Sequence, residues 1–264
     1  MPIPILQVDA FTNIPFGGNS AAVCLLPCPG EEVWMQNMAA EMNLSETAFL
    51  YRQKDHYDLR WFTPTTEVDL CGHATLAATH ALCEWGYLGD KEMVTYSTRS
   101  GFLTATRADN MIELNFPTEP ADEVESPPSH LLEALNLQAK FVGKNRLDYL
   151  IEVATTDEVK NLKPNFEQLK GLGLRGVIIT AKSDSSACDF VSRFFAPGAG
   201  INEDPVTGSA HCCLAPYWAN KLGKNELVAH QISQRKGELF LRLANDRTYI
   251  SGQAITIFKG ELMV

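Results

Sequence analysis

The chain has 264 residues, of which 45% are hydrophobic and 20% are charged, a composition typical of a folded globular protein and not of a disordered one. Its formal net charge is -10, because 32 acidic residues outnumber 22 Lys and Arg. That balance argues against nucleic acid and anionic membrane surfaces as partners, since such binding relies on Lys and Arg.

The sequence also lacks the usual signals of export and of metal binding. No basic stretch is followed by an apolar one at the N-terminus, and no apolar run reaches the length of a membrane span. The seven cysteines are scattered, without a Cys-x-x-Cys pair or the Cys/His spacing of a zinc site. We therefore expect a cytoplasmic protein with buried, reduced thiols and no metal.

The first half is predicted to contain short strands with two helices among them. One helix is expected at 31–42, where apolar residues recur with helical spacing, and another at 72–85, which is rich in Ala and Leu and stops at Gly86. The apolar and β-branched runs predict strands at 5–11, 21–26, 48–52, 59–63, 93–96, 101–107 and 111–116.

A segment rich in proline and acidic residues follows at 117–129 and is predicted to be an exposed linker. Beyond it, helices are expected at 166–172 and 209–222. Strands are expected at 149–153, 176–180, 190–195 and 255–258. The domain boundaries are accordingly placed at 1–117 and 118–264.

Two segments, 60–74 and 193–211, repeat the same order of residue types. Each begins with an Arg-aromatic-Phe-x-Pro string, continues through an acidic loop and reaches Gly-x-Ala at the start of a helix. One such match can arise by chance, but the whole ordered string favours an internal duplication.

The two Gly-x-Ala strings, which begin at Gly72 and Gly208, are candidates for binding an anion. A helix N-terminus presents unpaired backbone N–H groups and the positive end of the helix dipole, and Gly lets a ligand oxygen come close. For a single such string, a loop-shaping role is the simpler interpretation. The duplicated setting favours a site for the carboxylate of a small anionic substrate.

Several motifs together resemble the phenazine-biosynthesis PhzF-like proteins. They are Asp9-Ala10-Phe11-Thr12, then Gly17-Gly18-Asn19-Ser20-Ala21, then Asn43-Leu44-Ser45-Glu46-Thr47, then Cys71-Gly72-His73-Ala74, and finally Glu203-Asp204-Pro205-Val206-Thr207-Gly208-Ser209-Ala210. They run in the family's order and cover essentially the whole chain.

The resemblance implies an α/β (α+β) fold of the diaminopimelate epimerase type. Such a fold has two similar lobes, each a mostly antiparallel sheet wrapped around a central helix, with the site in the cleft between them. By the same resemblance, residues 252–264 can return to complete the N-terminal lobe at 1–117, and the protein is expected to form a homodimer.

The resemblance also places the family's catalytic acid/base at Glu46. From its spacing alone, Glu46 fits a capping or surface residue, because Ser-Glu pairs suit turns and helix starts. The apolar strand that follows it is the partly desolvated setting that suits a carboxyl exchanging protons near neutral pH.

Other candidate residues cluster around the two repeated motifs. His73 is expected to donate a hydrogen bond or carry a proton, and Asp204 to orient His73 or a substrate amine. A lone structural histidine and a turn aspartate are the plainer interpretations of these two. The predicted substrate contacts are Asn19, Gly72, Ala74, Gly208, Ser209 and Ala210.

Cys71 decides between two mechanisms. Diaminopimelate epimerase uses a cysteine before the glycine in each half, whereas this chain has Cys71 in one half and Thr207 in the other. A threonine hydroxyl does not ionise usefully near pH 7, so we expect one base and not two. The sequence thus predicts a cofactor-independent isomerase that moves a proton between carbons of a small carboxylate-bearing substrate. Cyclic amino acid-like molecules are among the candidate substrates.

Two alternatives stay open at this point. One is a ligand-binding or regulatory protein on an isomerase scaffold. The other is a cysteine-dependent racemase or epimerase that uses Cys71, whose thiol lies where a helix N-terminus favours the thiolate.

Overall fold

The computed structural model describes residues 2–263 and divides the chain into two compact units. Unit 1 comprises Met1–Phe116 together with Ile250–Val264, and unit 2 comprises Pro117–Tyr249. Both combine a large sheet with a few helices, and within the described residues no helix is both long and apolar enough to cross a membrane.

Unit 1 contains most of the strands expected for the first half, and the last strand of the chain joins them. Its helices are α1 (Glu32–Met42) and α2 (Gly72–Glu84). Its strands are β1 (Ile3–Ala10), β2 (Asn19–Leu26), β3 (Glu46–Arg52), β4 (Tyr57–Phe62), β5 (Glu67–Val68), β6 (Met93–Thr98), β7 (Gly101–Ala108), β8 (Met111–Pro117) and β18 (Ala254–Leu262).

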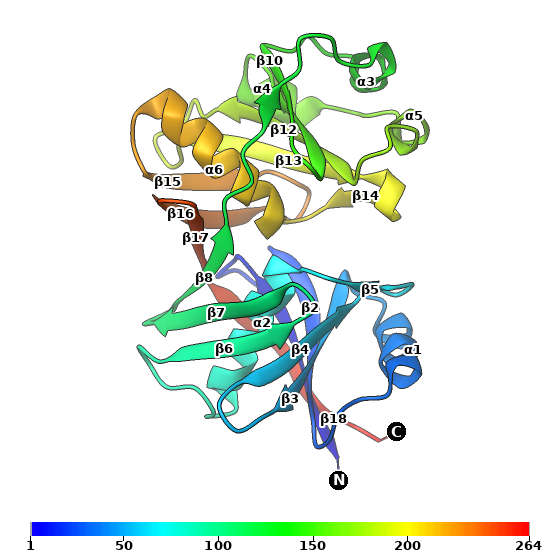
Figure 1. Ribbon diagram of the computed structural model, residues 1–264, viewed down its shortest axis with the longest axis vertical. Coiled ribbons are helices and arrows are strands. Elements are labelled where there is room, and N and C mark those ends of the chain that lie inside the picture. Colours follow the sequence, from blue (N-terminus) through cyan, green and yellow to red (C-terminus); the bar gives the residue numbers. More distant parts are fainter. Residues whose placement is uncertain (1, 264) are drawn as a thin grey trace. The chain divides into compact units, whose positions relative to one another are not determined.

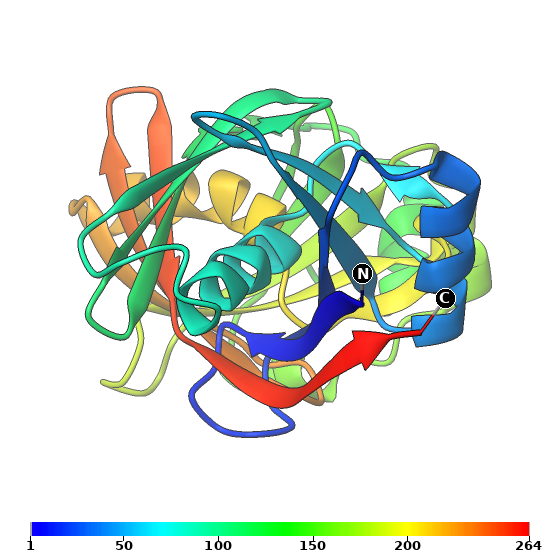
Figure 2. The same cartoon turned by 90° about the horizontal axis from the view of Figure 1, so that it is seen from below.

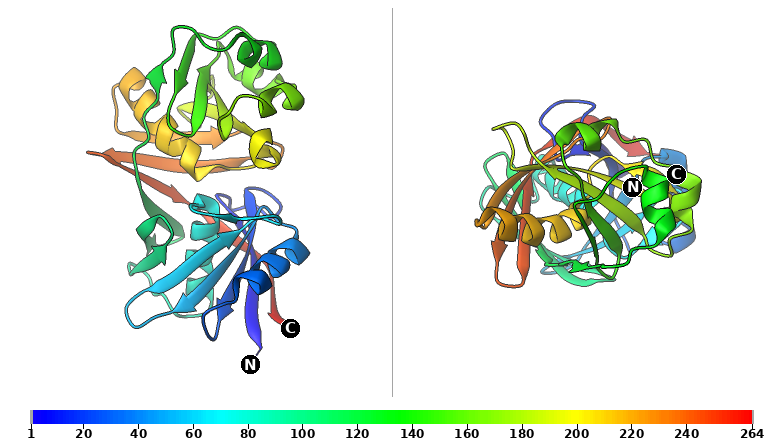
Figure 3. Two further views of the ribbon diagram at one scale, coloured as in Figure 1. Left: turned by 45° about the vertical axis from the view of Figure 1, so that its right-hand side comes forward. Right: turned by 90° about the horizontal axis from the view of Figure 1, so that it is seen from above.

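The strands of unit 1 form a curved sheet around α2. β1 pairs with β18 and β2 in antiparallel fashion, and β2 runs parallel to β3. β3 pairs with β4, which runs parallel to β6, and the sheet continues through β7 to β8. Figure 2 shows α2 inside the curve of this sheet, and β1 and β18 lie side by side in Figure 3.

Both faces of this sheet are covered, which explains the apolar runs that predicted its central strands. α2 packs against β1, β2 and β3 on one face, and α1 covers β3 and β4 on the other (Figure 1). A core cluster that includes Cys24, Met35 and Phe49 fills the α1 side. Strands buried on two faces read as continuous apolar segments and not as alternating ones.

Unit 2 is built from shorter strands and more helices. The helices are α3 (Ser129–Leu135), α4 (Thr156–Asn161), α5 (Phe166–Lys170), the 3-10 helix η1 (Pro197–Ala199) and α6 (Gly208–Leu222). The strands are β9 (Asp122–Glu123), β10 (Phe141–Lys144), β11 (Asp148–Glu152), β12 (Gly176–Lys182), β13 (Phe190–Ala196), β14 (Ile201–Asp204), β15 (Glu226–Gln231), β16 (Gly237–Ala244) and β17 (Arg247–Gly252), the last of which ends in unit 1.

The pairing order of unit 2 repeats that of unit 1. β10 is antiparallel to β11, β11 is parallel to β12, β12 is antiparallel to β13, and β13 is parallel to β15. α6 connects the parallel pair β13 and β15, just as α2 connects β4 and β6. The two similar lobes expected from the duplicated motifs are therefore present.

Part of the predicted linker is structured, which corrects the sequence analysis. β9 lies inside residues 117–129 and pairs with β10, where Glu123 faces Gly143 and Asp122 faces Lys144. α3 begins at Ser129, where no helix was predicted, and its Leu131 and Leu135 belong to the core of unit 2. A two-residue strand and a seven-residue helix leave too little periodicity to detect from sequence.

The expected elements otherwise match within a few residues. α2 was predicted to end at Trp85 and ends at Glu84, and α6 begins at Gly208, one residue before its predicted start. We keep two statements as predictions about which parts of the chain fold separately. One is the domain boundary at 117/118, and the other is the completion of the first lobe by residues 252–264.

Candidate active site

The N-terminus of α2 is the centre of the candidate site in unit 1. Cys71 is the N-cap residue and has an extended backbone, Gly72 and His73 begin the helix, and no side chain accepts a hydrogen bond at this cap. The carbonyl of Cys71 accepts hydrogen bonds from the Thr75 backbone N–H at 3.1 Å and from the Thr75 hydroxyl at 2.6 Å, which fix the first turn. The first N–H groups of a helix lack partners within the helix, and here that of Ala74 interacts with the Cys71 thiol.

Glu46 reaches this helix start because of the way β2 and β3 pair. Glu46 is the first residue of β3 and lies opposite Ala21 of the parallel strand β2. The turn before β2 needs Gly18, whose φ of +60° suits glycine and whose added Cβ would lie 2.1 Å from the carbonyl oxygen of Ala10. The tight turn places Asn19 at the start of β2, fully buried.

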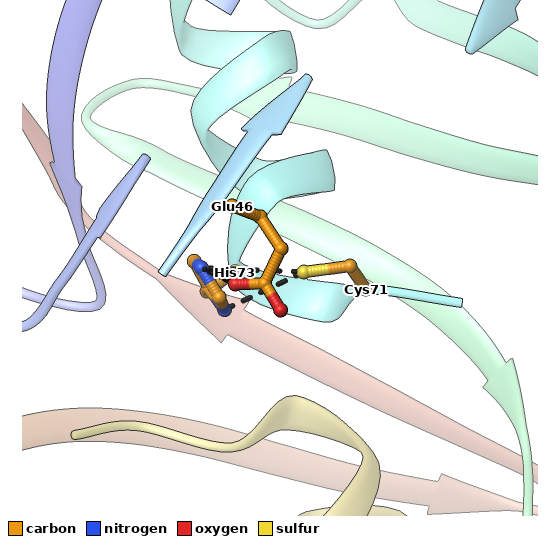
Figure 4. Close-up of side chains that lie close together, drawn as sticks. All are labelled: Glu46, Cys71 and His73. Atoms are coloured by element: carbon orange, nitrogen blue, oxygen red, sulfur yellow. Dashed lines mark hydrogen bonds and ion pairs between the residues drawn. The ribbon is translucent and has the colours of Figure 1, made fainter. Parts of the chain in front are cut away.

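Glu46 and His73 form a buried ion pair. The Oε2 of Glu46 lies 3.0 Å from the Nε2 of His73, and the two side chains are 11% and 5% exposed. On the other side of the ring, the amide of Asn19 lies 3.1 Å from the Nδ1 of His73. Figure 4 shows the Glu46 and His73 side chains turned toward each other beside the start of α2.

Cys71 and Glu46 together set the pKa of His73. Burial alone lowers the pKa of a histidine, but the negative charges and hydrogen bonds that Cys71 and Glu46 offer outweigh it and raise the pKa of His73 well above its ordinary value. Burial also raises the pKa of the Cys71 thiol. A pKa of His73 above its ordinary value favours the protonated imidazole beside the Glu46 carboxyl group.

Cys71 contacts the same imidazole. Its Sγ lies 3.5 Å from the Nδ1 and 4.0 Å from the Nε2 of His73 (Figure 4). Its raised pKa has burial as the main cause, and the nearby charge of Glu46 adds to it. The thiol therefore lies against the ring of His73.

The N-terminus of α6 has a different set of neighbours. Thr207 is the N-cap residue, and its hydroxyl donates to the Oδ2 of Asp204 at 2.5 Å. Its backbone N–H donates to the Oε1 of Gln231 at 2.8 Å, and the amide nitrogen of Gln231 donates to the carbonyl of Asp204 at 2.7 Å. Asp204 is thus held in the loop by Thr207 and Gln231.

Ser209, the second residue of α6, contacts an arginine. The Nη1 of Arg175 donates to the Ser209 hydroxyl at 2.8 Å, while the other guanidinium nitrogens bind the buried carboxylate of Asp148, with Nε to Oδ1 at 3.0 Å. The Arg175 guanidinium also lies 5.1 Å from the ring centre of Phe194. The start of α6 therefore has a hydroxyl and a guanidinium side by side.

The structure gathers the predicted residues into two groups. In unit 1, Asn19, Glu46 and His73 are in contact at the helix start that Gly72 and Ala74 help to form. In unit 2, Gly208, Ser209 and Ala210 open α6, shortly after β14 ends at Asp204. The predicted effect of Asp204 on His73 stays a prediction.

Sequence reasoning missed Arg175 and Gln231. Arg175 belongs to the Gly-rich stretch at 171–176, and Gln231 ends β15 far from the repeated motif. Aligning the two halves by their parallel strands would have indicated Arg175. In the parallel pair of unit 2, Gly176 lies opposite Asp148, just as Glu46 lies opposite Ala21 in unit 1. Arg175 therefore corresponds to Ser45, the residue before β3.

Comparison with known proteins identifies the family of this chain. Residues 8–260 match the model of the PhzC-PhzF family, described as phenazine biosynthesis-like protein. The chain belongs to this family. An uncharacterized isomerase of Halalkalibacterium halodurans is 52% identical over 264 residues, with full coverage of both chains. The crystal structure of a PhzF family protein of Enterococcus faecalis has a TM-score of 0.95 and 40% identity, again over both whole chains.

More distant structures confirm the predicted fold. A probable proline racemase of Agrobacterium radiobacter has a TM-score of 0.65 at 14% identity, with 99% of this chain and 93% of that chain covered, a likeness of fold alone. This PhzF-family chain has the diaminopimelate epimerase-like fold. Because its curated relatives are named isomerases, the expectation of an isomerase acting on a small molecule is confirmed at that level.

Proposed function

We propose that the protein is a cofactor-independent isomerase that moves a proton between two carbons of a small carboxylate-bearing substrate, with Glu46 as the acid/base. The observation that carries the proposal is the buried ion pair between Glu46 and His73 at an uncapped helix start. A nearly buried carboxyl group is a competent base when it is ionised, since little water has to be removed when it meets a carbon-bound proton.

The chemistry follows from the charges of the pair. Glu46 takes a proton from one carbon, and the electron pair of the broken C–H bond spreads over the conjugated system of the substrate. The protonated Glu46 then gives the proton to another carbon of that system. His73, cationic beside it, and the N–H groups at Gly72 stabilise the negative charge that develops between the two steps.

The remaining predicted residues are proposed as substrate contacts. The amide of Asn19 contacts the Nδ1 of His73, whereas Glu46 contacts the Nε2. Asn19 therefore orients the ring, and it contacts the substrate only at the helix start. Ser209, beside Gly208 and Ala210, carries a hydroxyl suited to a carboxylate. Cyclic amino acids and unsaturated cyclic carboxylates are the substrate classes that we would test first.

Solvent exchange tests the assignment of Glu46. In D2O, wild-type protein is expected to place deuterium on the reacting carbon of at least one cyclic amino acid or unsaturated cyclic carboxylate, as seen by proton NMR. Glu46→Gln keeps the size of the side chain but cannot accept a proton, and it is expected to lower the exchange rate by about 100-fold or more.

Glu41→Gln is the matched control, because Glu41 is an exposed glutamate of α1 in the same unit. It is expected to exchange at the wild-type rate. Exchange retained in Glu46→Gln would contradict the assignment. The thiol alternative makes the opposite prediction, since a cysteine-dependent racemase would lose activity in Cys71→Ala. A ligand-binding protein would show a raised melting temperature with one of these compounds and no exchange in any variant.

A further inference from the structure

We propose that Glu46, Cys71 and His73, called here the Glu46 cluster, bind one thiophilic divalent cation of the Zn²⁺ type. The cation occupies the place where protons are transferred. Binding of the cation does not depend on the proposed function, whereas inhibition by it rests on that function.

The distances in the Glu46 cluster suit a small cation. One donor atom from each of the three residues can be chosen so that all three lie within 4.8 Å of one another. The Nε2 of His73 is 3.0 Å from the Oε2 of Glu46 and 4.0 Å from the Sγ of Cys71. Tetrahedral zinc places N, O and S ligands about 3.3–3.6 Å apart, so shifts of a few tenths of an ångström bring the two distances from Nε2 into that range.

The carboxylate of Glu46 has spare capacity to bind a cation. Its Oε2 is buried and, among the residues that the structure describes, has no hydrogen-bond partner of good geometry, although it lies at ion-pair distance from His73. A buried oxygen that lacks an aligned hydrogen bond is costly for the protein, so an added cation gains energy there.

The cluster also supplies the correct charge. On binding, the His73 imidazolium and the Cys71 thiol each release one proton, so that Zn²⁺ is held by a neutral imidazole, a thiolate and a carboxylate. The +2 charge of the metal then meets two negative ligands, and the two released protons carry the remaining charge into solution. This neutral complex offsets the unfavourable position of a cation at a helix N-terminus.

Asn19 completes the surroundings of the histidine. Its amide lies 3.1 Å from the Nδ1 of His73, which leaves the Nε2 for the metal. Either end of the amide can face the ring, so the Asn19 oxygen can accept the proton that stays on Nδ1. Such a second partner fixes the ring of a metal-binding histidine in many zinc sites.

Three protein ligands leave the fourth position of a tetrahedral ion open to water or to a substrate carboxylate. In this complex Glu46 uses its lone pair on the metal and cannot take a carbon-bound proton. The cation is therefore an inhibitor of the proposed reaction and not its cofactor. A thiolate ligand favours Zn²⁺, Co²⁺ and Cd²⁺ over Mg²⁺ and Ca²⁺, which prefer oxygen.

Cobalt titration of chelator-treated protein tests the proposal without any substrate. Wild-type protein is expected to bind one equivalent of Co²⁺ with a near-ultraviolet thiolate-to-cobalt band and visible bands typical of a tetrahedral ion, and Zn²⁺ is expected to displace it. Cys71→Ala is expected to lose the near-ultraviolet band, and Glu46→Gln to weaken binding by about 100-fold. Circular dichroism and the melting temperature establish that each variant is folded.

Cys28→Ser is the matched control, because Cys28 is exposed and lies outside the cluster. It is expected to keep the full cobalt spectrum. The proposal is overturned if wild-type protein shows no thiolate band, if Cys71→Ala keeps it, or if Cys28→Ser abolishes it. The wild-type spectrum alone can overturn the proposal, whatever the variants do.

The two proposals can fail separately. Solvent exchange is measured in the presence of a chelator, and cobalt binding is measured without substrate. Exchange that depends on Glu46, combined with no cobalt binding, removes only the metal site. Cobalt binding at the cluster, combined with exchange that persists in Glu46→Gln, removes only the proposed function.

Discussion

The starts of α2 and α6 share one backbone design and differ in chemistry. Each helix follows an extended N-cap residue without a side-chain cap and opens with a buried glycine. At α2 the second residue is His73, paired with Glu46. At α6 the second residue is Ser209, paired with Arg175.

The fourth residue of each helix shows the same contrast. The hydroxyl of Thr75 donates to the N-cap carbonyl of Cys71 at 2.6 Å. In α6 the ring of His211 lies with its Nδ1 2.8 Å from the carbonyl of Thr207 and stacks beside Phe190. The threonine hydroxyl does not titrate, whereas the His211 imidazole takes up a proton in acid, because burial lowers its pKa to about 4.

The comparison shows that the duplicated backbone determines the position at which polar side chains come into contact. The identity of single residues at that position determines the chemistry. In unit 1 the meeting point holds an acid and a base that can exchange a proton. In unit 2 it holds a serine hydroxyl and an arginine guanidinium. The asymmetry agrees with a mechanism that uses one base.

Removing the guanidinium at the α6 start is expected to have the largest effect on stability. Arg175→Met leaves the carboxylate of Asp148, which is 1% exposed, without its bidentate partner. The expected loss is about 3 kcal/mol in the free energy of unfolding, at the low end for a buried pair because Arg175 itself is 29% exposed. Urea denaturation of both proteins measures it.

Ser45→Ala is the matched change in unit 1, because Ser45 precedes β3 as Arg175 precedes β12. It is expected to cost below about 1 kcal/mol. Adding Asp148→Asn to Arg175→Met is expected to restore part of the loss, since no charge is then left buried. Equal stabilities for wild type and Arg175→Met would show that the pair does not stabilise unit 2.

The next effect concerns pH and His211. Burial lowers the pKa of this histidine from 6.5 to about 4. Above pH 6.5 the ring is neutral in both folded and unfolded chains, so it makes no pH-dependent contribution. Between pH 6.5 and 4 only the unfolded chain takes up the proton, which reduces stability by an amount that reaches about 3 kcal/mol below pH 4.

His211→Gln separates this contribution from the titration of the carboxylates. The glutamine amide can still donate to the Thr207 carbonyl but does not titrate. The difference in unfolding free energy between pH 7 and pH 4.5 is expected to be smaller in the variant than in wild type. The same pH dependence in both proteins would mean that His211 is protonated in the folded chain.

The parts of the fold that could be predicted from sequence have strong local signals. α2 and α6 combine a glycine start, an Ala-rich face and a clear end, so their bounds were predicted within one residue. α4 was missed although Thr155 and Glu158 form a capping box that the sequence displays. β9 is only two residues long and is defined by its pairing with β10.

The candidate site was predictable in its residues but not in its contacts. Glu46 and His73 were identified through a resemblance, because nothing local distinguishes Glu46 from a capping glutamate. Their contact depends on the register of β2 against β3 and on the position of α2, which are long-range features. The pairing of Arg175 with Ser209 is long-range in the same sense, and no local pattern indicated it.

The protonation state of His73 tests the central claim most directly, because it needs no substrate. We expect nitrogen NMR of the imidazole to show both ring nitrogens protonated at pH 7 in wild-type protein, since Cys71 and Glu46 together raise the pKa of His73. In Glu46→Gln the pKa is expected to fall and one nitrogen to lose its proton. A neutral His73 at pH 7 in wild-type protein would contradict the ion pair on which the proposed proton transfer rests.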